Sequence, residues 1–200
     1  MALTPAEVRA LWELRDDAII DVRPRLWATW GFCSRHAWGQ FIVELELRGL
    51  PPTTLALYED LLRRAVEPAP DWVDWLRPTG ACLVCEELVD EEGWTQETAV
   101  VNRRERTITL LQDCASHWTS RTCPRCLGGD GLTCRPHLLE DGGSFDVDAL
   151  RDLRRVIEGT GDALSYPPRT VLPREWVAVV EAIGWFAGWT ELRTILPDRN

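Results

Sequence analysis

Every cysteine and every histidine in this chain has another member of the same set three positions away. The seven cysteines and three histidines of the 200 residues therefore form five pairs. These pairs are Cys33/His36, Cys82/Cys85, Cys114/His117, Cys123/Cys126 and Cys134/His137. A gap of two residues lets a tight turn point both side chains at one ion, and two pairs complete a tetrahedral shell around Zn²⁺. The pattern predicts a fold that brings pairs together around zinc, with two ions per chain.

The most local of the predicted zinc sites combines two neighbouring pairs. Its ligands are Cys123, Cys126, Cys134 and His137. The loop between the pairs is short, so the entropy cost of closing it is small. Pro124 and the run Gly128-Gly129-Asp130-Gly131 supply residues that favour tight turns. We therefore predict a Cys₃His zinc site within this segment.

A second zinc site needs Cys82 and Cys85, because they form the other Cys-x2-Cys pair. The spacing leaves two candidates for the rest of the shell. One candidate is the pair Cys33 and His36, and the other is the pair Cys114 and His117. The pair that is left over could be a weak ligand set, a reactive thiol or a pair packed in the core.

Five motifs in this order resemble a family of uncharacterised bacterial cytoplasmic proteins with Cys-x2-Cys and Gly-Phe-Cys-x2-His zinc modules on a helical frame. They are Gly31-Phe-Cys-Ser-Arg-His-Ala-Trp38, Leu57-Tyr-Glu-Asp-Leu-Leu62, Cys82-Leu-Val-Cys85, Gly131-Leu-Thr-Cys-Arg-Pro-His-Leu138 and the Trp176 helix that ends at Phe186-Ala-Gly188. The resemblance spans residues 25–190 and implies a fold and a metal but no activity. Such proteins often carry a further Cys pair before the Gly-Phe-Cys motif, and this chain has no Cys before Cys33. The resemblance therefore favours Cys33 and His36 as partners of Cys82 and Cys85, with Cys114 and His117 as alternative ligands.

The periodicity of apolar residues predicts a mostly α fold. Thr4-Pro5-Ala6-Glu7 is a capping box with Pro at the first helical position. A strand pattern in Arg106-Thr-Ile-Thr-Leu-Leu leaves room for a short β-hairpin near 106–122. The chain divides into an N-terminal helical part (1–80), a zinc-module part (81–143) and a C-terminal helical part (144–200), within one compact domain. The predicted helices are 5–20, 35–48, 53–66, 72–76, 83–92, 146–158 and 174–187, with a break at Pro24, a stop at Gly159 and a loop over 113–143. The pattern over 93–112 is ambiguous, and 97–104 is a possible further helix.

Charge and composition narrow the possible partners. The net charge is −10, all 22 basic residues are Arg, and the absence of Lys excludes Walker-type and Schiff-base lysines. An acidic chain without a basic tract is not expected to bind nucleic acid. No signal peptide is evident, and the longest apolar stretch, 176–189, contains Glu181 and is too short for a membrane span. We therefore expect a cytoplasmic protein without a membrane partner, whose cysteines bind metal rather than form disulfides.

The ligand pattern leaves little for catalysis. If all three histidines bind metal, none remains as a general base, and no histidine is followed by Glu in the His-x-Glu pattern of zinc deaminases. No catalytic residue is predicted, and a function without catalysis is favoured over an enzymatic one. The favoured function is a zinc-stabilised protein-interaction or regulatory module. The alternatives are a thiol-based redox or metal sensor and, less favoured, an enzyme with an open zinc site.

Tryptophan is the other unusual feature, with 11 residues. Packing in the core is the ordinary use of such residues. Trp27 and Trp30, like Trp72 and Trp75, are three positions apart and flank the Gly31 motif and the Pro-rich turn. Loops on a rigid scaffold often carry recognition residues, and Trp is frequent in binding hot spots. We therefore predict that these four residues form an exposed surface that binds a protein partner.

Overall fold

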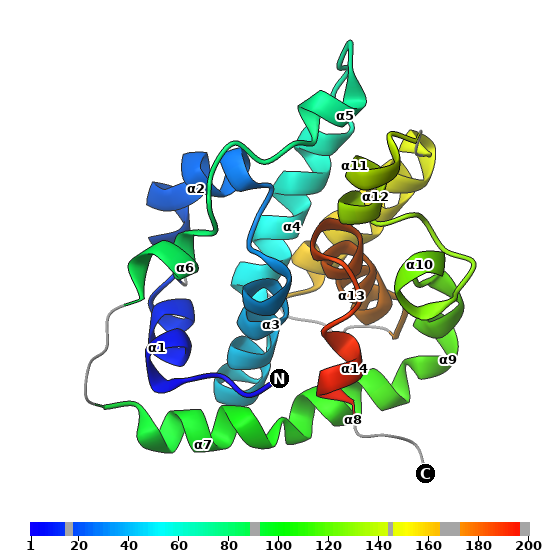
Figure 1. The fold of residues 1–200 in the computed structure, drawn as a ribbon. Helices are drawn as coiled ribbons and strands as arrows, with labels where there is room; N and C mark the ends of the chain where they lie inside the picture. The colour runs from blue at the N-terminus through cyan, green and yellow to red at the C-terminus, as the bar shows by residue number, and fades with distance from the viewer. Residues whose placement is uncertain (15–17, 89–92, 144–145, 165–172, 197–200) are drawn as a thin grey trace.

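Helices make up all the regular secondary structure in the residues that the computed structural model describes, namely 1–14, 18–88, 93–143, 146–164 and 173–196 (Figure 1). The prediction of a mostly α fold is confirmed. The elements in order are α1 (Pro5–Glu13), α2 (Ala18–Thr29), α3 (Ser34–Arg48), α4 (Pro52–Ala65), α5 (Trp72–Trp75), α6 (Leu83–Glu87), α7 (Thr95–Arg103), α8 (Glu105–Asp113), α9 (Ala115–Trp118), the 3₁₀ helix η1 (Thr119–Arg121), α10 (Pro124–Leu127), α11 (Arg135–Asp141), α12 (Val147–Leu164), α13 (Pro173–Ala187) and α14 (Leu192–Ile195).

Helix α3 is the centre of the fold. Its residues 36–46 are all buried, and it packs against α1, α4, α7, α8 and α13. Gly49 ends the helix in the left-handed conformation, with φ of +83°, which a residue with a side chain would adopt only under strain. The position of α3 matters because its first turn carries one of the Cys-x2-His pairs.

Two buried carboxylates of α3 fix the neighbouring helices in place. Glu44 accepts hydrogen bonds from the backbone N–H groups of Thr53 and Thr54, in the first turn of α4, and from the Thr54 hydroxyl. Glu46 does the same for the start of α8, accepting from the backbone N–H and the hydroxyl of Thr107. Carboxylates at helix N-termini satisfy N–H groups that have no partner inside the helix. The two residues therefore position α4 and α8 relative to α3.

The prediction of a possible β-hairpin near 106–122 is wrong, because α8, α9 and η1 occupy this segment. Thr107, Leu111 and Cys114 are buried, a spacing of four and three that fits one face of a helix. The alternation of Thr with Ile and Leu imitates a strand. The hydrogen bonds of Thr107 to Glu46 and the packing of Leu111 favour the helix instead.

Two predicted breaks do not occur. Pro24 lies inside α2, and α12 continues through Gly159 to Leu164. A helical Gly costs about 1 kcal/mol relative to Ala, which burial of neighbouring side chains can offset. In α12 Ile157 and Thr160 are buried on either side of Gly159. The segment 113–143 also differs from the predicted loop, since it contains α9, η1, α10 and α11.

Five of the tryptophans are buried and pack in the centre of the fold. They are Trp30, Trp38, Trp118, Trp185 and Trp189. The remaining six are half-buried, so none of the eleven stands free on the surface.

No helix in the described part of the chain combines the length and apolar character that crossing a membrane requires.

Candidate metal centres

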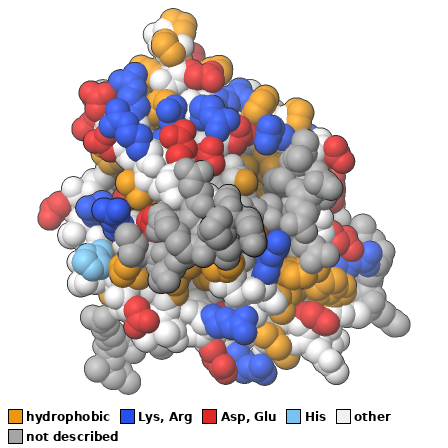
Figure 2. All heavy atoms as spheres, turned by 180° about the vertical axis from the view of Figure 1, so that it is seen from behind, with side chains coloured by type: hydrophobic (Ala, Val, Ile, Leu, Met, Phe, Trp, Pro, Cys, Tyr) orange, Lys and Arg blue, Asp and Glu red, His pale blue; other side chains and the backbone are white. Residues whose placement is uncertain are grey.

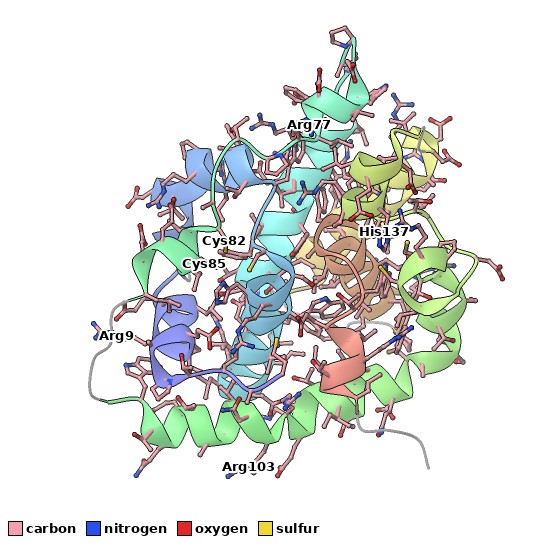
Figure 3. The ribbon with its side chains drawn as sticks, viewed as in Figure 1. Arg9, Arg77, Cys82, Cys85, Arg103 and His137 are labelled. Atoms are coloured by element: carbon pink, nitrogen blue, oxygen red, sulfur yellow. The ribbon has the colours of Figure 1, made fainter. Side chains whose placement is uncertain are left out.

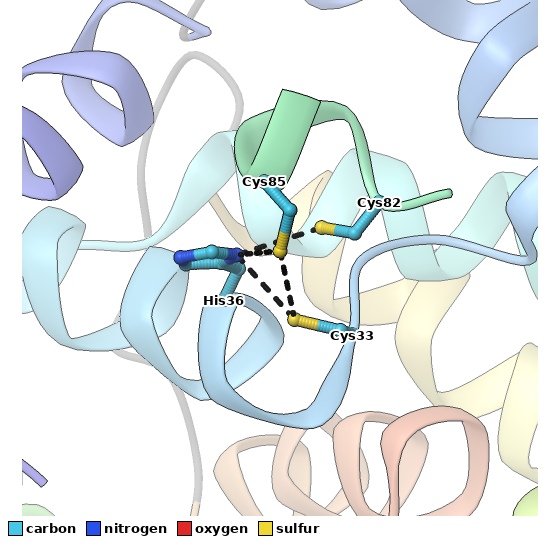
Figure 4. A group of neighbouring side chains, drawn as sticks. All are labelled: Cys33, His36, Cys82 and Cys85. Carbon is cyan, nitrogen blue, oxygen red and sulfur yellow. Dashed lines mark hydrogen bonds between the residues drawn. The ribbon is translucent and has the colours of Figure 1, made fainter. Parts of the chain in front are cut away.

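The first cluster joins the N-terminal ends of α3 and α6. Cys33 directly precedes α3 and His36 lies in its first turn, while Cys82 directly precedes α6 and Cys85 lies within it. The Nδ1 atom of His36 lies 3.4 Å from Sγ of Cys33, 3.5 Å from Sγ of Cys82 and 3.3 Å from Sγ of Cys85 (Figure 4). The two sulfurs of Cys33 and Cys85 are 3.9 Å apart. The four ligand atoms all lie within 4.8 Å of one another.

The second cluster is built from α10 and α11. Cys123 directly precedes α10, which contains Cys126, and Cys134 directly precedes α11, which contains His137. The Nδ1 atom of His137 lies 3.4 Å from Sγ of Cys123, 3.4 Å from Sγ of Cys126 and 3.3 Å from Sγ of Cys134. The sulfurs of Cys126 and Cys134 are 3.6 Å apart. Figure 3 shows that the two clusters lie apart, the one with Cys82 and Cys85 beside α6 and the one with His137 beside α10 and α11.

Hydrogen bonding cannot account for this convergence. A histidine Nδ1 has either one proton or one lone pair, so it forms one hydrogen bond, yet three sulfurs surround it in each cluster. With metal–sulfur bonds of about 2.3 Å and a metal–nitrogen bond of about 2.0 Å, the edges of a tetrahedron are about 3.5–3.8 Å long. The separations of 3.3–3.9 Å in the two clusters agree with these lengths. Both clusters could therefore hold a tetrahedral metal ion.

Each cluster repeats one local design. A cysteine caps a helix and the second ligand follows three residues later, in the first turn of that helix. The positive end of a helix dipole stabilises thiolates, which are the form of cysteine that binds metal. Burial raises the pKa of Cys123, but backbone N–H groups and His137 outweigh this effect and lower it to about 6. In the first cluster, hydrogen bonding from Cys33 lowers the pKa of the Cys82 thiol.

Glu7 orients the histidine of the first cluster, and the metal-ligand pattern did not reveal this role. Its Oε1 lies 3.0 Å from Nε2 of His36, so Nε2 carries the proton and Nδ1 is left with a lone pair for the metal. Arg35 donates to both carboxylate oxygens of Glu7, at 2.5 and 2.8 Å. Burial alone would raise the pKa of Glu7, but hydrogen bonds from Arg35, the backbone of Thr4 and His36 lower it to about 2. Glu7 therefore stays ionised.

Glycine shapes the loop of the second cluster. A Cβ atom at Gly131 would lie 1.8 Å from the carbonyl oxygen of Arg121, which is impossible without moving the backbone. The Gly131 N–H donates to the carbonyl of Thr122, and the Asp130 N–H donates to that of Ser120. These bonds tie the loop to the turn before Cys123. The Gly-rich run is therefore required by a close approach of two backbone segments.

The structure brings Cys33 and His36 to Cys82 and Cys85, and not Cys114 and His117. Cys114 is buried, with its sulfur 4.0 Å from the carbonyl of Pro173, whereas the side chain of His117 is exposed. In the described part of the chain this pair contributes to neither cluster. The alternative pairing is therefore not the arrangement seen here, and the pair left over is Cys114 and His117.

The four predicted interaction residues do not share one exposed surface. Trp30 is only 2% exposed and donates from its indole N–H to the carbonyl of Trp75, so the prediction of a surface role is wrong for Trp30. Trp27, Trp72 and Trp75 are half-buried. The guanidinium of Arg64 lies 5.4, 5.1 and 4.9 Å from the ring centres of Trp27, Trp30 and Trp75. This stacking gives the cluster a packing role that its spacing in the sequence does not reveal.

No protein-family model matches the chain, and neither does any curated protein or solved structure among those compared. The resemblance to a bacterial zinc-module family therefore stays a prediction.

Proposed function

We propose that this protein is a zinc-stabilised helical module that acts by binding another protein. The observation that carries the proposal is the complete ligand set of each cluster, with three cysteines and one histidine. Thiolate and imidazole donors in tetrahedral positions favour Zn²⁺. Four protein ligands leave no open position for water or substrate, which is the pattern of structural rather than catalytic zinc.

The cysteines support metal binding over cross-linking. None of the seven forms a disulfide, as is usual in a reducing compartment. A cytoplasmic location fits this state and stays a prediction. The net charge of −10 disfavours nucleic acid as the partner, because binding to phosphates gains its free energy from neutralising them.

Helix α5 is the best candidate for a contact with a protein partner. It lies in the projection at one end of the molecule, just below the loop that forms the tip (Figure 1). Its two tryptophans, Trp72 and Trp75, are half-buried, so part of each indole is accessible while the rest is held in place. Indoles that are already ordered lose little conformational freedom on binding, which is why Trp is frequent in hot spots.

Replacing Trp72 with Ala should separate binding from folding. We expect capture of the partner to fall at least tenfold, since hot-spot residues contribute about 2 kcal/mol or more. The free energy of unfolding should change by less than about 1.5 kcal/mol, because the side chain is only half-buried. Affinity capture followed by quantitative mass spectrometry, together with denaturant unfolding, measures both quantities.

The matched control is Trp94→Ala, because Trp94 is also half-buried but precedes α7 at the opposite end of the molecule (Figure 1). It should leave partner capture unchanged. If Trp72→Ala keeps full capture and loses about 3–5 kcal/mol of stability, Trp72 is a core residue and the interaction surface is misassigned.

A sensor function is the second candidate, and the exposure of Cys85 favours it. In the first cluster Cys85 is exposed and Cys33 and Cys82 are half-buried, whereas all three cysteines of the second cluster are buried. Exposed thiolates react first with oxidants. Hydrogen peroxide could oxidise Cys33 and Cys85, whose sulfurs are 3.9 Å apart, to a disulfide while the peroxide is reduced to two water molecules.

Limited peroxide should then release one zinc ion before the other. A colorimetric zinc indicator should register one equivalent, and peptide mapping should locate the new disulfide at Cys33 and Cys85. The second cluster is the internal control, because it has the same donor set and is buried. Simultaneous release of both ions, or earlier release from Cys123 and its partners, would rule out a sensor at the first cluster.

A further inference from the structure

Arg135 is a buried cation beside the second cluster. It directly follows Cys134, begins α11 and is only 8% exposed. Its guanidinium donates to two backbone carbonyls, those of Leu76 and Phe186, each at 3.1 Å. No carboxylate in the described part of the chain pairs with it. An arginine stays charged at neutral pH, so the fold buries a positive charge whose counter-charge is not a carboxylate.

The arginines on the surface are in a different situation. Arg63 pairs with Glu59 and Arg121 with Glu181, and both arginines are more than half exposed. On the face seen in Figure 2, basic side chains have acidic ones among them. Water screens such charges, whereas a buried cation without a negative charge nearby is costly. The burial of Arg135 therefore calls for a negative charge inside the fold.

The two cysteine clusters can supply that negative charge. A zinc ion with three thiolates and one neutral imidazole carries one net negative charge, and each cluster has this ligand set. Arg135 is next to Cys134 in the chain. Tyr58 of α4, which is 1% exposed, senses the first cluster as well as Arg135. Burial raises the pKa of its hydroxyl, the cation of Arg135 lowers it, and the thiolates of Cys82 and Cys33 raise it.

The hydrogen bonds of Arg135 also connect the surroundings of the two clusters. Leu76 directly follows α5, in the segment that leads to α6 and its cysteine pair. The ring of Phe186 stacks on that of Trp30, with the ring centres 6.2 Å apart, and Trp30 lies three residues before Cys33. Arg135 therefore joins α11, which carries a ligand of the second cluster, to both chain segments that carry the ligands of the first.

We propose that Arg135 is the shared counter-charge of the two clusters and couples zinc binding at one cluster to zinc binding at the other. This inference rests on the zinc sites of the proposed function. Helix α11 has seven residues, so it depends on the second cluster for its order. Without zinc there, the two carbonyls lose their donor and the segments that lead to the first cluster are less firmly held. Zinc at either cluster should therefore raise the affinity of the other, by the same factor.

Zinc competition on the full-length chain tests this inference. Zinc is buffered with a chelator at graded free concentrations, free thiols are alkylated, and peptide mapping reports which cysteines zinc protects. Cys126→Ser disables the second cluster. The free zinc concentration that half-protects Cys82 and Cys85 should then rise about fivefold or more, as is usual for coupled sites. In an Arg135→Gln background, Cys126→Ser should change that concentration less than about twofold, because the coupling residue is already absent.

Two further variants separate the charge of Arg135 from its size. Arg135→Lys keeps the cation and should retain part of the shift, about threefold or more. Arg135→Met keeps the length without the charge and should lose the shift as Arg135→Gln does. It replaces Arg135→Gln if circular dichroism at saturating zinc shows that the latter does not fold. The matched control is Arg193→Gln, because Arg193 is exposed and donates to the carbonyl of Cys126 at 2.8 Å. This control should leave the full shift in place.

Equal half-protection of Cys82 and Cys85 in the wild type and in Cys126→Ser would overturn the inference. So would a shift that persists without the arginine, or an Arg135→Lys variant that behaves like Arg135→Gln. Protection of both clusters without coupling removes this inference and leaves the zinc sites in place. A wild-type chain whose cysteines zinc does not protect would overturn the zinc sites and this inference together.

Discussion

Removing zinc with a strong chelator should unfold at least residues 113–143 and lower the stability of the whole chain. The helices of this segment that carry ligands are four residues (α10) and seven residues (α11) long. Isolated helices of this length are unstable in water, so they depend on the metal and on tertiary contacts. Structural zinc contributes on the order of 10 kcal/mol to modules of this kind. Far-ultraviolet circular dichroism should lose helical signal, and the thermal transition should move to lower temperature or disappear.

The control for this experiment is the same chelator already saturated with zinc, which should have no effect. Adding zinc back under reducing conditions should restore the helical signal. An unchanged spectrum and an unchanged melting temperature after verified metal removal would show that the clusters do not stabilise the fold.

Spacing in the sequence predicts the second cluster well because its chemistry is local. Four ligands within one short segment leave few ways to meet, and the Gly-rich run between them fits a tight turn. The first cluster depends on contacts between residues far apart in the chain, of Cys33 with Cys85 and of His36 with Cys82. Spacing left two pairings open there. The resemblance to zinc-module proteins favoured the pairing that the structure shows.

Residues around the ligands were harder to predict, because their roles depend on how helices pack. Glu7 is visible in the sequence as part of the capping box of α1, and the structure shows both that bond and the contact with His36. The packing of α1 against α3 is what brings the Glu7 carboxylate to His36. A buried capping residue that lies near a predicted metal ligand is a signal that could be used elsewhere.

The errors have a common physical origin, since local patterns were outweighed by tertiary contacts. Thr107 begins an alternating, strand-like run, yet its contacts with Glu46 place it in a helix. Trp30 flanks a glycine turn, as an exposed recognition residue would. Its ring is nevertheless buried and stacks on Phe186, with the ring centres 6.2 Å apart. Neither contact, of Thr107 with Glu46 or of Trp30 with Phe186, can be identified from neighbouring positions in the chain.

Cys33→Ser and Cys82→Ser should each lose the same zinc ion, and the double variant should lose no more. One tetrahedral shell cannot be lost twice, so the effects of the two substitutions are not additive. Replacing either ligand should also lower the free energy of unfolding by several kcal/mol, because metal binding and folding are coupled. Cys114→Ser is the matched control, since Cys114 is a buried thiol outside both clusters, and it should keep both zinc ions.

Native mass spectrometry of the freshly purified wild-type chain and these variants tests the central claim most directly. The proposed zinc sites predict two zinc ions on the wild type and on Cys114→Ser, and one on Cys33→Ser, on Cys82→Ser and on their double variant. A wild-type chain without bound metal would contradict the claim. So would a second zinc ion that is lost from Cys114→Ser and kept by Cys33→Ser.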